Sequence, residues 1–163
     1  MKRVLGIIGK IISNIVIVIL SIVLLLAIYN LINIRILKKD YTNLFGYTYF
    51  DIITGSMVDT INIDDYVFVK ITKDVKENDI ISFKYDGDIV THRIIEINDK
   101  EIITKGDANN TIDNPITKDD VIGKVIHVGR GFGLVSKTIM SPMVLVSLIV
   151  TIVLFGIYFS MKE

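Results

Sequence analysis

The chain has 163 residues, 51% of them hydrophobic, and its mean hydropathy of +0.55 is high for a soluble protein. Its 18 basic and 18 acidic residues balance, so it offers no basic stripe for a nucleic acid. The absence of cysteine excludes disulfides and thiolate metal sites. The hydrophobic excess is local, because two long charge-free runs contribute most of it.

The first run, residues 11–34, contains no charged side chain. A helix rises about 1.5 Å per residue, so this run covers roughly 36 Å, more than the hydrocarbon core of about 30 Å. We therefore expect a transmembrane helix over residues 11–36, preceded by an N-terminal segment of residues 1–10. A cleaved signal peptide is the competing interpretation, but the run exceeds the usual apolar core of about 7–15 residues and no small-residue cleavage site follows it.

The region of residues 37–137 has a different pattern, with short β-branched and aromatic segments separated by turn residues. Asp86-Gly87, for example, is a hairpin turn signal. Six strands are expected, over residues 47–53, 66–71, 80–85, 89–97, 101–104 and 121–128. We therefore predict a mainly β domain in the form of a distorted barrel, with one helical turn over residues 56–61.

The second charge-free run, residues 138–161, predicts a second transmembrane helix, followed by residues 162–163 as the C-terminus. Positive charges flank both ends of the first run, so they do not select an orientation. Two spans would place both termini on one side of the membrane and residues 37–137 on the other. The predicted fold is thus a β domain flanked by two transmembrane α-helices.

Four polar residues of the central region supply, in order, the groups of a serine nucleophile and its helpers: Ser56, His92, Asp107 and Asp113. A serine hydroxyl needs a base to remove its proton, and an imidazole can do so near neutral pH. A carboxylate on the far imidazole nitrogen would fix the ring tautomer. Each residue also has an ordinary structural interpretation, as a helix-start cap, a sheet-face histidine or a solvated turn residue.

The remaining candidates are interpreted as structural. His127 lies on the last predicted strand beside glycines, and no carboxylate motif is near it in sequence. Lys70 and Lys84 would act as bases only if desolvated, and exposed strand positions are the simpler interpretation. The Asp- and Asn-rich segment around residue 110 lacks the spacing of an EF-hand, so no metal and no cofactor are predicted.

Three segments resemble, in order and spacing, the conserved boxes of type I signal peptidases: Thr54-Gly55-Ser56-Met57, Gly87-Asp88-Ile89-Val90-Thr91-His92-Arg93, and Thr104-Lys105-Gly106-Asp107-Ala108-Asn109-Asn110 followed by Asp113. The middle box has histidine where the common bacterial subtype has lysine. That is the pattern of the Ser/His subtype, found in the endoplasmic reticulum, in archaea and in some Gram-positive spore formers. The similarity extends over about residues 47–128.

The resemblance implies a membrane-bound serine endopeptidase with its β-rich catalytic domain at the outer membrane surface. With two spans, residues 1–10 would then be cytoplasmic. By similarity, Ser56 attacks and His92 is the base, with Asp113 the preferred orienting acid and Asp107 the other candidate. The Thr54 hydroxyl and the Ser56 backbone N–H would form the oxyanion hole. Implied partners are the signal peptides of exported preproteins, cut after small residues, together with the lipid bilayer and the secretion translocon.

One position departs from the family pattern. The family usually has proline three residues after the nucleophile, and this chain has Asp59 there. We expect Met57 and Asp59, which follow the nucleophile, to contact substrate, so this change bears on specificity. Two alternatives remain: a catalytically silent, membrane-anchored β domain that binds a partner protein, and a self-cleaving repressor-like protease, which normally needs a lysine base and a DNA-binding domain.

Overall fold

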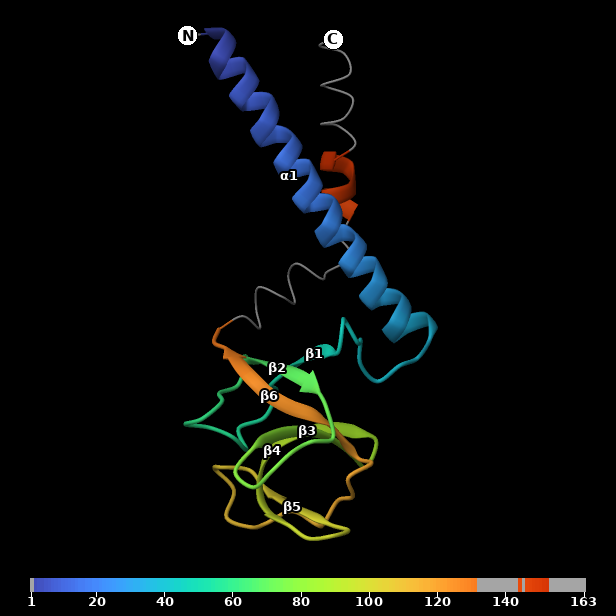
Figure 1. Ribbon diagram of the computed structural model, residues 1–163, viewed down its shortest axis with the longest axis vertical. Coiled ribbons are helices and arrows are strands. Elements are labelled where there is room, and N and C mark those ends of the chain that lie inside the picture. Colours follow the sequence, from blue (N-terminus) through green and yellow to red (C-terminus); the bar gives the residue numbers. More distant parts are fainter. Residues whose placement is uncertain (1, 132–143, 145, 153–163) are drawn as a thin grey trace. The chain divides into compact units, whose positions relative to one another are not determined.

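The computed structural model describes residues 2–131, 144 and 146–152. The chain divides into two compact units, Met1–Asp40 with Ser136–Glu163, and Tyr41–Val135 (Figure 1). The first unit contains the long N-terminal helix and the second contains the β-sheet. This division separates the apolar, helical part of the chain from the part that carries the polar motifs.

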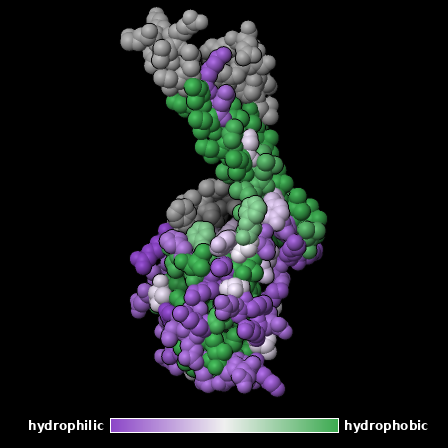
Figure 2. Space-filling model, in the orientation of Figure 1, coloured by the Kyte–Doolittle hydropathy of each residue, from purple (hydrophilic) through white to green (hydrophobic). Residues whose placement is uncertain are grey.

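Helix α1, Lys2–Leu31, continues into a short π-helix η1, Ile32–Ile36. Within the described residues, the stretch Lys10–Ile36 is the one helix long and apolar enough to cross a membrane, and 6% of its most apolar window is buried. The buried amide of Asn33 is satisfied, because it donates to the Tyr29 carbonyl at 2.9 Å. Figure 2 shows the apolar side chains along this helix. Such an exposed apolar surface suggests membrane association.

The second predicted span, residues 138–161, lies largely outside the described residues. Residues 144 and 146–152, which the structure does describe, are helical. The prediction of a second transmembrane helix therefore stays a prediction.

The second unit is built on one antiparallel sheet of six strands, in the order β1-β2-β6-β3-β4-β5. The strands are β1 Tyr47–Asp51, β2 Tyr66–Ile71, β3 Ile80–Tyr85, β4 Asp88–Ile97, β5 Ile102–Lys105 and β6 Val121–Gly129. All six lie where the sequence pattern predicts them. The first ends at Asp51 rather than at residue 53, because the chain leaves the sheet there to form the loop that carries Ser56.

The sheet is strongly curved (Figure 1) but has two ends, so the barrel that the sequence predicted is not seen in the described residues. β1 forms one edge and β5 the other. The outer side of β5 is covered by a different segment, since Ile102 and Ile116 exchange backbone hydrogen bonds of 2.8 and 3.0 Å. This segment follows Asp113 directly in the chain, so its pairing with β5 fixes the position of Asp113.

Two clusters of buried apolar side chains pack against the sheet. One consists of Ile81, Phe83, Ile94, Ile102, Ile116 and Val121. The other consists of Ile52, Met57, Ile61, Val67 and Val69. Full burial of such a side chain contributes about 1.5–3 kcal/mol. Since three members of the second cluster belong to the loop after β1, core packing holds that loop in place.

Gly123 allows β6 to lie close to β2. A Cβ atom at this position would be 2.1 Å from the Lys70 carbonyl oxygen and 2.9 Å from the Ile71 Cα, both of which are backbone atoms. Gly129 lies on the same strand, but its nearest neighbour there would be a Phe68 side-chain atom at 3.3 Å.

We expect Gly123→Ala to destabilise the sheet unit by at least about 1–3 kcal/mol, because the backbone must shift to admit the methyl group. Gly129→Ala is the matched control and should cost clearly less, since a side chain can move aside more easily than backbone. Denaturant titration of both variants would measure the difference. Equal stabilities for the two variants would contradict this account of the β2–β6 approach.

Candidate active site

Ser56 lies in a closed loop between β1 and β2. Backbone hydrogen bonds of 2.9 Å from Ile52 to Asp65 and from Asp64 to Ile52 join the two ends of the loop. Inside it, Met57 and Ile61 are fully buried and the Ile61 N–H donates to the Met57 carbonyl at 2.7 Å. The expected helical turn is therefore present as a hydrogen-bonded turn. The loop is anchored by its core residues, which leaves Ser56 half-buried beside them.

Asp65 fixes the base of the same loop. This side chain is buried, and one of its oxygens accepts the Asn62 N–H at 2.9 Å while the other accepts the Gly131 N–H at 3.0 Å. Hydrogen bonds to an ionised carboxylate are stronger than neutral ones. The carboxylate therefore ties the base of the Ser56 loop to the chain just after β6.

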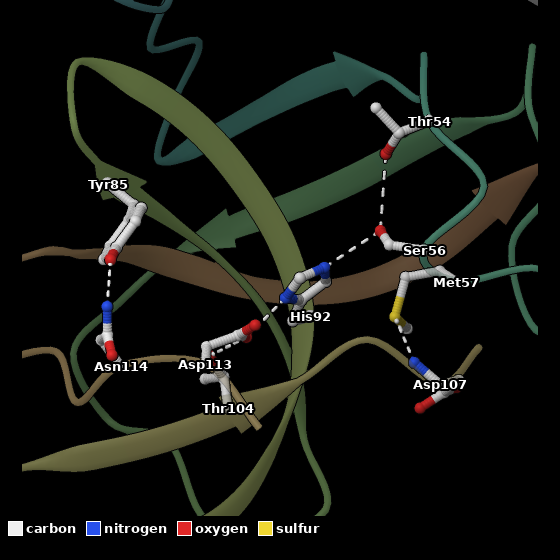
Figure 3. Close-up of polar contacts among 9 residues, drawn as sticks. All are labelled: Thr54, Ser56, Met57, Tyr85, His92, Thr104, Asp107, Asp113 and Asn114. Atoms are coloured by element: carbon white, nitrogen blue, oxygen red, sulfur yellow. Dashed lines mark hydrogen bonds and ion pairs between the residues drawn. The ribbon is translucent and has the colours of Figure 1, made fainter. Parts of the chain in front are cut away.

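His92 lies on β4 with 7% of its surface exposed. Its Nε2 is 3.0 Å from the Ser56 hydroxyl oxygen, and its Nδ1 is 2.6 Å from a carboxylate oxygen of Asp113 (Figure 3). The two ring nitrogens thus face the two partners that nucleophilic catalysis requires. The Phe83 ring and the imidazole are arranged roughly edge to face, with ring centres 6.3 Å apart.

Asp113 is held by β5 and by its neighbour in sequence. Its N–H donates to the Thr104 carbonyl at 2.9 Å, and the buried Thr104 hydroxyl donates to its carboxylate at 2.7 Å. Asn114 donates from its amide to the Tyr85 hydroxyl at 2.8 Å (Figure 3). The carboxylate is therefore oriented from β5, while the following residue is fixed to β3.

Asp107 contacts different partners from Asp113. Its carboxylate accepts from the Arg93 guanidinium at 2.9 and 2.7 Å and from the Thr60 hydroxyl at 2.5 Å. The Arg93 hydrogen bonds, helped by the one from Thr60, lower the pKa of the Asp107 carboxyl, while the same contact raises the pKa of Arg93. Because Arg93 lies on β4 and Thr60 in the Ser56 loop, Asp107 joins these two elements beside the His92–Ser56 contact.

The segment around Asp107 also packs on the backbone of Ser56. The Ala108 N–H donates to the Ser56 carbonyl at 2.9 Å, and a Cβ at Gly106 would lie 2.5 Å from the same oxygen. The Asp107 N–H approaches the Met57 sulfur at 3.3 Å. Glycine at 106 thus permits a close approach that a side chain would block.

The other predicted site residues lie around Ser56 in different ways. The Thr54 hydroxyl is 3.4 Å from the Ser56 hydroxyl (Figure 3). Met57 borders the cleft but is only 1% exposed and packs in the core. Asp59 is exposed and does not line the cleft, and its φ of +78° is one that proline, fixed near −65°, cannot adopt.

A cleft of about 620 Å³ opens beside Ser56 and His92. Its lining comes from residues 50–54, 56–57 and 88–92. β4 pairs with β5 only from Arg93 onward, so the β5-facing backbone edge of its first half, residues 88–92, has no strand partner in the described sheet. An apolar cleft beside an open strand edge suits an extended peptide. Within the described residues, no group of three metal-binding side chains converges.

The sequence pointed to Ser56, His92 and Asp113, but it did not point to the residues that hold these three in place. The contacts of Thr60 and Gly106 have no local signature in sequence, because their partners Asp107 and Ser56 lie far along the chain. Thr104 falls inside the third resembling segment, but nothing in the sequence assigned it a role beside Asp113. Arg93 follows His92 inside the second resembling segment, and this position is the sequence signal that could have identified it. The sequence also left Asp107 and Asp113 as alternatives, and the structure brings only Asp113 to within hydrogen-bond distance of the imidazole.

The lowered pKa of Asp107 predicts a pH-dependent stability difference. A carboxylate whose folded pKa lies below its unfolded value of about 3.8 stabilises the fold above that unfolded pKa. It loses this contribution as pH falls through the folded pKa. Wild type should therefore be more thermally stable than Asp107→Asn at about pH 5–7. The advantage should shrink below about pH 4. A pH-independent difference would mean that Asp107 acts through packing alone.

Comparison with known proteins gives a result that agrees with these motifs. No protein-family model matches the chain. The chain is 34% identical over 121 residues to signal peptidase I W of Bacillus subtilis (strain 168), a match that covers 69% of this chain and 63% of that protein. The chain thus spans less than two thirds of that relative's length. This match supports a relationship to the signal peptidase I family.

Proposed function

We propose that the chain is a membrane-anchored serine endopeptidase of the Ser/His type, which removes N-terminal signal peptides from exported preproteins. The observation that carries the proposal is the pair of contacts that His92 makes, 3.0 Å to Ser56 and 2.6 Å to Asp113, beside an open cleft. The relationship to the signal peptidase I family supplies the substrate class.

In the proposed mechanism, the Ser56 oxygen attacks the scissile carbonyl carbon while His92 Nε2 takes the hydroxyl proton. Asp113 accepts from Nδ1–H, which keeps Nε2 free for this proton and stabilises the imidazolium that forms. The imidazolium then gives the proton to the leaving amine as the peptide bond breaks. Water, deprotonated by the same imidazole, hydrolyses the acyl-enzyme and regenerates the serine hydroxyl.

The negative charge that develops on the carbonyl oxygen needs hydrogen-bond donors. The Thr54 hydroxyl, 3.4 Å from the Ser56 oxygen, and the Ser56 backbone N–H are the proposed donors. Their positions are set by the closed loop and not by the substrate, so little reorganisation is needed during the reaction. Loss of one such donor typically lowers the rate about 10²–10³-fold.

The cleft is the proposed binding site for the substrate. The segment before the cut would lie extended and pair with the open edge of residues 88–92, so that alternate side chains point into the cleft. Small side chains near the cut would let the substrate backbone approach Ser56. In this arrangement backbone hydrogen bonds supply affinity and the size of the cleft supplies selectivity.

Anchoring in the membrane would concentrate the enzyme at its substrate. The apolar helix Lys10–Ile36 is the proposed anchor, with residues 138–161 as a second span. The sheet unit would then lie on the extracytoplasmic side, where signal peptides emerge. Confinement of enzyme and substrate to one surface raises their effective concentration.

The experiment is a cleavage assay with the full chain in liposomes and a preprotein that has an Ala-x-Ala site. The wild type should cut after the second alanine, and Ser56→Ala should abolish the cut because no other residue replaces the nucleophile. A folded wild type that leaves several such preproteins intact would contradict the proposal. Circular dichroism of both proteins would show whether each is folded.

Two aspartate variants separate the roles within this assay. Asp113→Asn should lower kcat by about 10³–10⁴-fold, because the imidazole loses its oriented tautomer. Asp107→Asn removes a partly exposed ion pair and should change the rate only a few-fold, since such pairs contribute about 0–1 kcal/mol. The reverse order of effects would assign the orienting role to Asp107.

A further inference from the structure

The turn before β1 is a tight, fully hydrogen-bonded structure. Leu44 and Tyr47 exchange backbone hydrogen bonds of 2.8 and 3.0 Å, and the two residues between them, Phe45 and Gly46, have φ angles of +53° and +86°. Two consecutive positive φ angles define a type I′ turn. The Asn43 side chain accepts the Gly46 N–H at 2.8 Å, which closes the turn from outside.

Phe45 is an unusual residue for the first central position of this turn. Type I′ turns favour Asn, Asp or Gly there, because a bulky side chain is strained at positive φ. The Phe45 side chain is also 93% exposed, so it gains no packing within the sheet unit in return. A large apolar side chain that is exposed to solvent at a strained backbone position indicates a contact outside the unit.

The surface next to this turn has the composition of a membrane interface. Tyr47, which follows the turn, is exposed and lies opposite Lys70 on β2. Tyr49 and Phe68 form the next exposed cross-strand pair. Aromatic rings together with lysine are typical of the headgroup region, where a ring can be partly buried and a charge can stay in water.

The order of the chain indicates which apolar phase would receive Phe45. Eight residues, among them Lys38 and Lys39, separate the end of the apolar helix at Ile36 from Phe45. At about 3.5 Å per residue, these link the two over no more than roughly 30 Å. Basic residues in such a link favour anionic lipid headgroups. The same bilayer that holds the helix is therefore within reach of the turn.

We propose that the Phe45 turn inserts into the headgroup–acyl boundary of the membrane and is a second membrane contact for the sheet unit. The inference rests on the membrane-anchored arrangement proposed above, and it adds a contact that does not depend on catalysis. Such a contact would limit the tilt of the sheet unit and hold the cleft at a fixed height above the bilayer.

Tryptophan fluorescence gives a direct test, because the chain contains no tryptophan. Phe45→Trp and, as a matched control, Ile95→Trp would each be reconstituted as the full chain. Ile95 is an exposed apolar residue of β4, away from the β1 edge of the sheet. The vesicles would contain phosphatidylcholine and phosphatidylglycerol, with and without bromine on the upper acyl chains.

We expect brominated lipids to quench the Phe45→Trp variant at least several-fold more than the Ile95→Trp variant. Equal quenching of both variants would overturn the proposal. Blue-shifted emission that bromine does not quench, but that depends on the protein-to-lipid ratio, would instead show that a second copy of the chain covers the turn, and this would overturn the proposal. Because quenching needs no substrate, failure of the cleavage assay would leave this result unaffected.

A second variant tests the strain argument. Phe45→Asn gives the Asn-Gly pair that type I′ turns prefer, so it should raise the melting temperature in detergent by a few degrees. A lower melting temperature would show that Phe45 stabilises the protein from within, and this would overturn the membrane interpretation of its exposure.

Discussion

The candidate site depends on one carboxylate oxygen. Asp113 Oδ2 accepts both the buried Thr104 hydroxyl, at 2.7 Å, and the His92 ring, at 2.6 Å. The threonine is on β5 and the histidine on β4, so the carboxylate converts the pairing of two strands into a fixed ring orientation. With Nδ1 held in this way, Nε2 faces Ser56. A shift of the Asp113 segment along β5 would move the carboxylate away from Nδ1 and would remove this alignment.

The serine side of the site is fixed by an independent set of contacts. Met57, the residue after Ser56, is buried in the core, while the Ser56 carbonyl accepts from the Ala108 N–H. The Asp107–Arg93 ion pair then joins this loop to β4. Core packing and the Asp107–Arg93 ion pair thus both set the distance between Ser56 and His92. Under the proposed function, stability and activity would therefore be coupled at the site, and we expect variants of Asp107 to affect both.

The sequence predicts the strands well because alternation and turn residues are local signals. The Asp86-Gly87 hairpin and the aromatic segment from Tyr47 are examples. Closure into a barrel does not follow from such local signals, since it depends on which segment covers β5, a non-local pairing. The choice between Asp107 and Asp113 also depends on a non-local contact. Both lie in one polar loop, and only the register beside Thr104 brings one of them to His92.

The tautomer of His92 tests the central claim most directly. The chain has two histidines, so a long-range ¹H–¹⁵N spectrum of histidine-labelled protein in micelles is simple to assign. At a pH where the ring is neutral, the account predicts that His92 carries its proton on Nδ1 and that Asp113→Asn disturbs this preference. A His92 ring protonated mainly on Nε2, or one unchanged in Asp113→Asn, would contradict the account.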